Sequence, residues 1–267
     1  MAPATANHQT HTDLVLIGWF ILGLLVFSAL FSAIALPFIH LSWVQTFRRC
    51  VSIAAALSLY LVITRVERRS ITSYGFSNLS IGTREFWFGC ALGIGGLIGL
   101  CVIGTVLGAY HVELLPNRLK LWGVVLGFVP AAILIGSLEE LVFRGFFFQH
   151  LKHYSQSFAL IASSTLYAVV HLKSPHFSYL TWLELGGLFL LGGVLCLSYI
   201  KTQQLFLAVG LHATLAYGAI VNKLLIAISG SSLWLTGTSR LVNGLAGWLV
   251  LLIVGVVISR MTERGTR

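Results

Sequence analysis

Long runs of apolar residues, joined by short polar loops, constrain the fold of this chain more than any other feature. Hydrophobic residues make up 57% of the 267 residues and charged residues only 9%, against about 25% charged residues in a typical soluble domain. The chain therefore lacks the polar surface that a soluble domain needs. A membrane-spanning helix needs about 20 apolar residues in succession, and we count eight candidate spans at residues 14–39, 46–65, 86–108, 121–150, 157–172, 180–200, 205–228 and 241–260.

Helices are the spanning elements that fit these runs. Strands of a transmembrane barrel alternate polar and apolar residues, and these runs do not. The sequence therefore predicts an all-α fold, a polytopic membrane bundle of about eight transmembrane helices. No linker or internal repeat is evident, so residues 1–267 are interpreted as a single integral-membrane domain. In the third run, the small residues of 89-GCALGIGGLIG-99 recur four apart, which predicts close helix packing.

The positive net charge is assigned to loops that flank the membrane. The chain carries a net charge of +9, but its basic residues are spread over short loops rather than gathered in a stripe, so no nucleic-acid partner is expected. The larger share falls on the side that would hold both termini, which predicts that both are cytoplasmic. The four cysteines are scattered without a CxxC pair, which disfavours a disulfide framework or a thiolate zinc site.

Three charged residues lie inside the apolar run 121–150, namely Glu139, Glu140 and Arg144. A charged side chain at mid-bilayer costs on the order of 2.5–3.5 kcal/mol. Glu140 and Arg144 are four residues apart, in the order that favours an ion pair on one helix face. Glu139 lies about 100° round the helix and lacks such a local partner. It therefore needs a partner from another helix, a water-filled cavity or a proton.

Two histidines occupy later apolar runs. His171 follows Tyr167 by four residues on the same helix face, and His212 lies about two turns into its run. Imidazole is the side chain that most readily binds a metal ion or moves a proton near neutral pH. A lone intramembrane histidine is equally often a hydrogen-bonding group between helices, but ionisable residues gathered on three spans favour a functional site. Glu184, near the start of its run, is a candidate interfacial or supporting acid.

At these positions the sequence resembles the CAAX-protease and bacteriocin-processing family, also called CPBP or Abi, of intramembrane endopeptidases. The family motifs are EExxxR, FxxxH and HxxxN on three membrane helices. The first is complete in 139-EELVFR-144, and the second occurs as 167-YAVVH-171, with tyrosine for phenylalanine. The third begins in 212-HATLA-216 but has Ala216 where the family has asparagine. The resemblance covers roughly residues 120–220, the motif-bearing core.

The resemblance implies a role for each matching residue. Glu139 would be the catalytic carboxylate that activates water, Glu140 would support the site, and Arg144 would orient the glutamates. His171 and His212 would lie across the cavity and either polarise the scissile carbonyl or hold a metal ion.

The alanine at position 216 removes an amide that, in the family, helps to form the oxyanion site. Tyr167 and Asn243 are the alternative donors that the sequence offers in its place.

Two mechanisms fit these residues. Glutamate-activated water, with the imidazoles as donors to the oxyanion, requires no cofactor. Alternatively, Glu139, His171 and His212 are candidate ligands for Zn²⁺, with one position left for water. We favour the first because the family is described as glutamate-type. The sequence has no GxSxG motif and only one aspartate, Asp13, which disfavours serine and paired-aspartate mechanisms.

The sequence therefore predicts an intramembrane endopeptidase of a bacterial inner membrane. Its partners would be the lipid bilayer and a membrane-associated protein or peptide, in which it hydrolyses a peptide bond. One alternative is a catalytically impaired member that serves as a membrane scaffold or a bacteriocin-immunity protein, which Ala216 favours. Another is a proton-coupled transporter that uses Glu139 and the histidines as a relay, although such carriers often show internal repeats.

Overall fold

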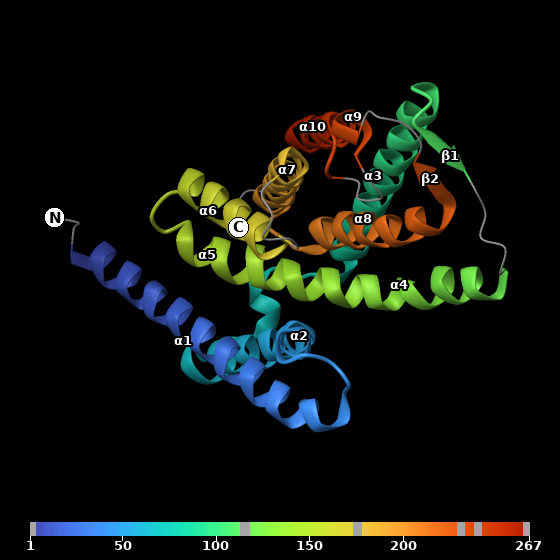
Figure 1. The fold of residues 1–267 in the computed structure, drawn as a ribbon. Coiled ribbons are helices and arrows are strands. Elements are labelled where there is room, and N and C mark those ends of the chain that lie inside the picture. Colours follow the sequence, from blue (N-terminus) through green and yellow to red (C-terminus); the bar gives the residue numbers. More distant parts are fainter. Residues whose placement is uncertain (1–3, 113–117, 173–177, 229–232, 238–241, 264–267) are drawn as a thin grey trace.

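The computed structural model describes residues 4–112, 118–172, 178–228, 233–237 and 242–263, which form a bundle of helices (Figure 1). Helices α1 and α2 pack against each other, and α8 packs against α3, α4 and α7 in the other part of the bundle. The α-helices are α1 (Ala4–Ala35), α2 (Trp43–Leu61), α3 (Leu79–Val106), α4 (Arg118–Glu140), α5 (Phe148–Leu151), α6 (Gln156–Val170), α7 (Tyr179–Thr202), α8 (Phe206–Leu225), α9 (Leu233–Thr236) and α10 (Leu245–Ser259).

Other elements connect these helices. Two are 3₁₀-helices, η1 (Leu36–Phe38) and η3 (Ile71–Tyr74), and two are π-helices, η2 (Val62–Val66) and η4 (Leu141–Phe147). Strand β1 (Tyr110–Val112) pairs antiparallel with β2 (Ile226–Ile228) and joins the end of α3 to the end of α8. The predicted helical membrane fold is confirmed, with this short pair as a small addition.

Each of the eight predicted runs coincides with a helix, but not every helix is a full-length span. Among the described residues, five stretches are long and apolar enough to cross a membrane: His11–Phe38, Trp43–Val66, Leu79–Val106, Leu121–Leu151 and Tyr179–Thr202. Helices α6 and α10 have 15 residues each, fewer than the ~20 that a bilayer requires. The number of full-length spans in the described part of the chain is thus smaller than the eight predicted.

Many large apolar side chains of the long helices point outward. Trp19 and Leu25 of α1 are 52% and 54% exposed, Ile98 of α3 is 59% exposed, and Ile253 of α10 is 55% exposed. In water such a surface would promote association. In a bilayer it faces lipid, as expected of an integral membrane protein.

The glycines of α3 allow it to pack closely on α8. A Cβ atom at Gly89 would lie 2.8 Å from the backbone nitrogen of Leu211, and one at Gly93 would lie 2.7 Å from Cβ of Thr214. Both distances are too short for a side chain, so small residues are required where the two backbones approach. The predicted close packing of this glycine-rich stretch is confirmed.

Serine residues begin the two helices that flank the site. The Ser155 hydroxyl accepts a hydrogen bond from the Phe158 N–H at 3.0 Å at the start of α6. At the start of α7, Ser178 and Thr181 form a reciprocal capping box. Such caps satisfy backbone donors that the first helical turn leaves free.

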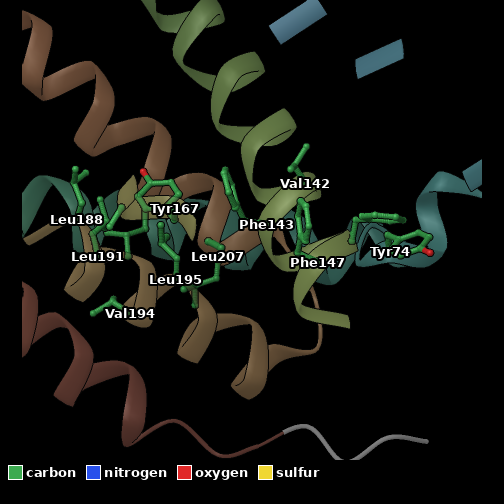
Figure 2. Packing of buried hydrophobic residues seen from close by; sticks show 14 of the residues in the cluster. Tyr74, Val142, Phe143, Phe147, Tyr167, Leu188, Leu191, Val194, Leu195 and Leu207 are labelled. Atoms are coloured by element: carbon green, nitrogen blue, oxygen red, sulfur yellow. The ribbon is translucent and has the colours of Figure 1, made fainter. Parts of the chain in front are cut away.

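A core of aromatic and leucine side chains lies between η4, α6, α7 and α8 (Figure 2). Phe143, Tyr167, Leu191, Leu195 and Leu207 are each at most 7% exposed. This core fixes the relative positions of the helices that carry the predicted site residues.

Candidate active site

The EExxxR motif lies where α4 changes into the π-helix η4. Helix α4 ends at Glu140, and η4 continues from Leu141 to Phe147, closing with a bond from the Phe148 N–H to the Phe143 carbonyl. The predicted helical span over residues 121–150 is present as one stretch, Leu121–Leu151, and its π-helical turns are a feature that the sequence did not indicate. Such wider turns are frequent at functional sites, and this one carries Arg144.

Glu140, Arg144 and His212 form a buried ion cluster. Arg144 Nη1 donates to Glu140 Oε1 at 2.9 Å, and both side chains are fully buried, so the predicted ion pair is confirmed. His212 Nδ1 lies 2.7 Å from the same carboxylate oxygen. Because a carboxylate only accepts hydrogen bonds, Nδ1 of His212 carries the hydrogen, and Nε2 is left to face the other glutamate.

Arg144 ties the motif to two further helices. Its Nη2 donates to the carbonyl of Gly192 in α7 at 3.0 Å. Its guanidinium carbon also lies 4.7 Å from the centre of the Tyr167 ring in α6, a cation–π distance. The arginine therefore fixes η4 against α6 and α7.

Glu139 faces both histidines. Its Oε2 atom lies 3.2 Å from Nε2 of His171 and 3.5 Å from Nε2 of His212. The Glu139 side chain is 26% exposed and that of His171 is 29% exposed, in contrast to the fully buried Glu140. Glu139 thus obtains from α6 and α8 the partners that its own helix does not provide. The five predicted site residues are brought together.

His171 is held in one orientation by the end of its own helix. It caps α6, and its Nδ1 atom lies 2.8 Å from the carbonyl oxygen of Tyr167. A carbonyl only accepts, so Nδ1 carries the hydrogen and Nε2 points to Glu139. Both imidazoles therefore use Nδ1 to anchor the ring and present Nε2 to the same carboxylate.

A cavity of about 280 Å³ opens beside these residues. Glu139, Tyr167 and His171 line it together with one face of α8, and its other described walls are mostly apolar side chains of α3, α7 and α10. The α8 face consists of His212, Leu215, Ala216, Ala219, Ile220 and Lys223. Lys223 is eleven residues from His212, a rise of roughly 16 Å along a helix. The cavity is therefore elongated, with the ionisable cluster towards one end.

Two further ionisable residues line the cavity. Lys223 is not among the residues predicted for the site, although its spacing from His212 and Ala219 puts all three on one helix face. Glu184, predicted to be an interfacial or supporting acid, also lines the cavity. Ala216 also lines it, whereas Asn243, named as an alternative donor, is buried and is not among the described lining residues.

The donor types of Glu139, His171 and His212 suit zinc. However, no group of three or more His, Cys, Asp or Glu side chains in the described part of the chain has a metal-binding arrangement. In this arrangement Nε2 of each histidine contacts Oε2 of Glu139 directly. Metal dependence stays a prediction.

Comparisons with known proteins support the resemblance. Residues 118–218 match the protein-family model described as Rce1-like, type II CAAX prenyl endopeptidase Rce1-like. This part of the chain includes all five predicted site residues. The predicted resemblance to the CPBP protease family is therefore confirmed over residues 118–218. Searches among curated proteins and among solved structures gave no match.

Proposed function

We propose that this protein is an intramembrane endopeptidase that hydrolyses a peptide bond with water activated by Glu139. The observation that carries the proposal is the position of Glu139 at an apolar cavity, with Nε2 of His171 and of His212 within 3.5 Å of its carboxylate. The match to a protease family over the same residues supports it.

In the proposed reaction Glu139 acts first as a base and then as an acid. A water molecule beside Oε2 gives one proton to the carboxylate, and its oxygen attacks the scissile carbonyl carbon. The carbonyl oxygen becomes an oxyanion, which a protonated Nε2 of His212 or His171 stabilises. When the C–N bond breaks, the proton held by Glu139 passes to the leaving amine, so that a carboxylic acid and an amine result.

Glu140 and Arg144 act through other residues. Glu140 holds His212 by its Nδ1 hydrogen, which keeps Nε2 directed at Glu139 and the cavity. Arg144 provides the positive charge that allows Glu140 to remain ionised while fully buried. Both are thus positioning residues rather than groups that touch the substrate.

The cavity favours an apolar substrate segment. Apart from the ionisable cluster, Glu184 and Lys223, its described lining is apolar. A peptide bond in the tail of a membrane-associated protein would reach it from the bilayer or from the membrane surface. The family description names a CAAX prenyl endopeptidase, and a lipid-modified peptide is one substrate that such a lining accommodates. We place both termini in the cytoplasm, which reporter fusions at each end test.

Turnover of peptides by the full-length chain in liposomes tests the proposal. Wild-type protein is incubated with a library of internally quenched apolar octapeptides, and cleavage is identified by fluorescence and mass spectrometry. Glu139→Gln should abolish cleavage, because an amide cannot accept the proton from water. Glu263→Gln is a matched control. The Glu263 side chain is 64% exposed, and it pairs with Lys201, which is distant from it in the sequence.

Two outcomes would contradict the proposal. If wild type and Glu139→Gln cleave equally, the glutamate is not the base. If neither cleaves while the intact protein still confers a measurable phenotype, the scaffold or immunity alternative is favoured instead.

A further inference from the structure

The hydroxyl group of Tyr167 lies within the ionisable cluster, beside the groups to which the proposed reaction gives a role. Tyr167 is 2% exposed, and it lines the cavity. Its hydroxyl oxygen lies 3.4 Å from Nε2 of His212, the atom that faces Glu139 at 3.5 Å. Of the described lining residues, Tyr167, His171 and His212 are those that bring hydrogen-bond donors to this end of the cavity.

The ring of Tyr167 is held on several sides. The Arg144 guanidinium stacks over it at 4.7 Å, and the Phe143 ring packs edge-on with a centroid distance of 5.2 Å. The His171 ring centroid lies 4.3 Å away. In Figure 2 the Tyr167 oxygen points away from Leu191 and Leu195 of the core. Its position is therefore fixed before a substrate arrives, which is the condition for effective electrostatic stabilisation of a transition state.

The Tyr167 hydroxyl makes a long contact with the cluster. Its oxygen lies 3.4 Å from Nε2 of His212, whereas Nδ1 of His212 is 2.7 Å from the Glu140 carboxylate. A substrate oxygen beside both groups can come closer to the hydroxyl than His212 does. When Nε2 of His212 carries a hydrogen, as in the proposed reaction, both groups can donate to that oxygen.

The distance between the two donors suits a single shared acceptor. Two donors 3.4 Å apart can both lie about 2.8 Å from one oxygen, within the range that oxyanion donors occupy. Ala216, one turn beyond His212 on α8, lines the same cavity without any donor. Tyr167 and Ala216 thus line the same cavity, and of the two it is Tyr167 that carries a donor.

We propose that Tyr167 is a catalytic residue whose hydroxyl donates a hydrogen bond to the carbonyl oxygen of the substrate as it becomes an oxyanion, together with Nε2–H of His212. This inference rests on the proposed peptidase function. It assigns to Tyr167 the donor that Ala216 lacks.

The test is Tyr167→Phe in the full-length chain, assayed in liposomes with the octapeptide that wild type cleaves best. Removal of one oxyanion donor typically lowers kcat by roughly 100-fold, and KM should stay within about threefold because the group acts in the transition state. Tyr217→Phe is the matched control: it removes a phenol of α8 that donates to the Val125 carbonyl at 3.0 Å and does not line the cavity. Adding Ala216→Asn to Tyr167→Phe should restore kcat at least tenfold.

The outcomes separate this inference from the proposed function. A wild type without Glu139-dependent cleavage overturns both. Glu139-dependent cleavage with a Tyr167→Phe kcat within twofold of wild type overturns only the role of Tyr167. An equal loss of kcat in Tyr217→Phe, or a Tyr167→Phe effect confined to KM, also overturns it.

Discussion

Replacing Arg144 with methionine measures how strongly the buried ion cluster stabilises the fold. The substitution leaves the Glu140 carboxylate fully buried without its guanidinium partner and removes the donor to the Gly192 carbonyl. Removing one partner of a buried ion pair destabilises a protein by about 3–5 kcal/mol. Losing a hydrogen bond from a charged group costs about 1.5–3 kcal/mol, a contribution that overlaps with the first. We therefore expect the free energy of unfolding to fall by about 4 kcal/mol.

The assay is equilibrium unfolding of the full chain in mixed micelles, titrated with a denaturing detergent. Lys201→Met serves as the control because it also removes a cation that pairs with a carboxylate, Glu263 Oε1 at 3.1 Å, but the side chain of this carboxylate is 64% exposed. Exposed pairs contribute about 0–1 kcal/mol, so this variant should remain close to wild type. Adding Glu140→Leu to Arg144→Met should recover part of the loss, since no uncompensated carboxylate then remains buried.

One result would refute this reasoning. If Arg144→Met lost no more stability than Lys201→Met, the Glu140 carboxylate would have to be solvated or neutral in the folded protein. The arginine could then not be what keeps His212 and Glu140 in place.

Three further changes probe other parts of the structure. Ala219→Trp should fill the cavity and lower octapeptide cleavage at least tenfold, as measured by initial rates; unchanged rates would mean that substrate does not enter there. Treatment with 1,10-phenanthroline should leave cleavage unchanged under the glutamate mechanism, and a loss reversed by added Zn²⁺ would show that a metal is required. Tyr110→Phe removes the hydrogen bond to the Thr236 carbonyl at 2.6 Å and should reduce stability by about 1 kcal/mol. Burial raises the pKa of Tyr110 to about 12 from about 10 in the unfolded chain, so wild-type stability should fall as pH rises from about 10 towards 12. Thermal midpoints at pH 8, 10 and 11 should show a smaller fall in the phenylalanine variant, and parallel curves would contradict this.

The amino-acid sequence is enough to predict the helical membrane architecture, because long apolar runs leave helices as the way to satisfy backbone hydrogen bonds in a bilayer. It also determined the pairing of Glu140 with Arg144, since residues four apart meet on any helix. The residue spacing in this motif does not, however, indicate that the turn carrying Arg144 is π-helical. Nor did hydropathy distinguish full-length spans from 15-residue helices such as α6.

The partners of Glu139, in contrast, depend on how the helices pack together. His171 and His212 come from two other helices, and nothing in the spacing of residues far apart in the sequence specifies that both Nε2 atoms reach one carboxylate oxygen. That convergence depends on how α4, α6 and α8 pack, which the glycines of α3 and the buried arginine help to set. The same packing brings the Tyr167 hydroxyl next to His212. Helix packing also gives Ala216 a place in the cavity wall, because a side chain acquires neighbours from other helices only once those helices are in contact.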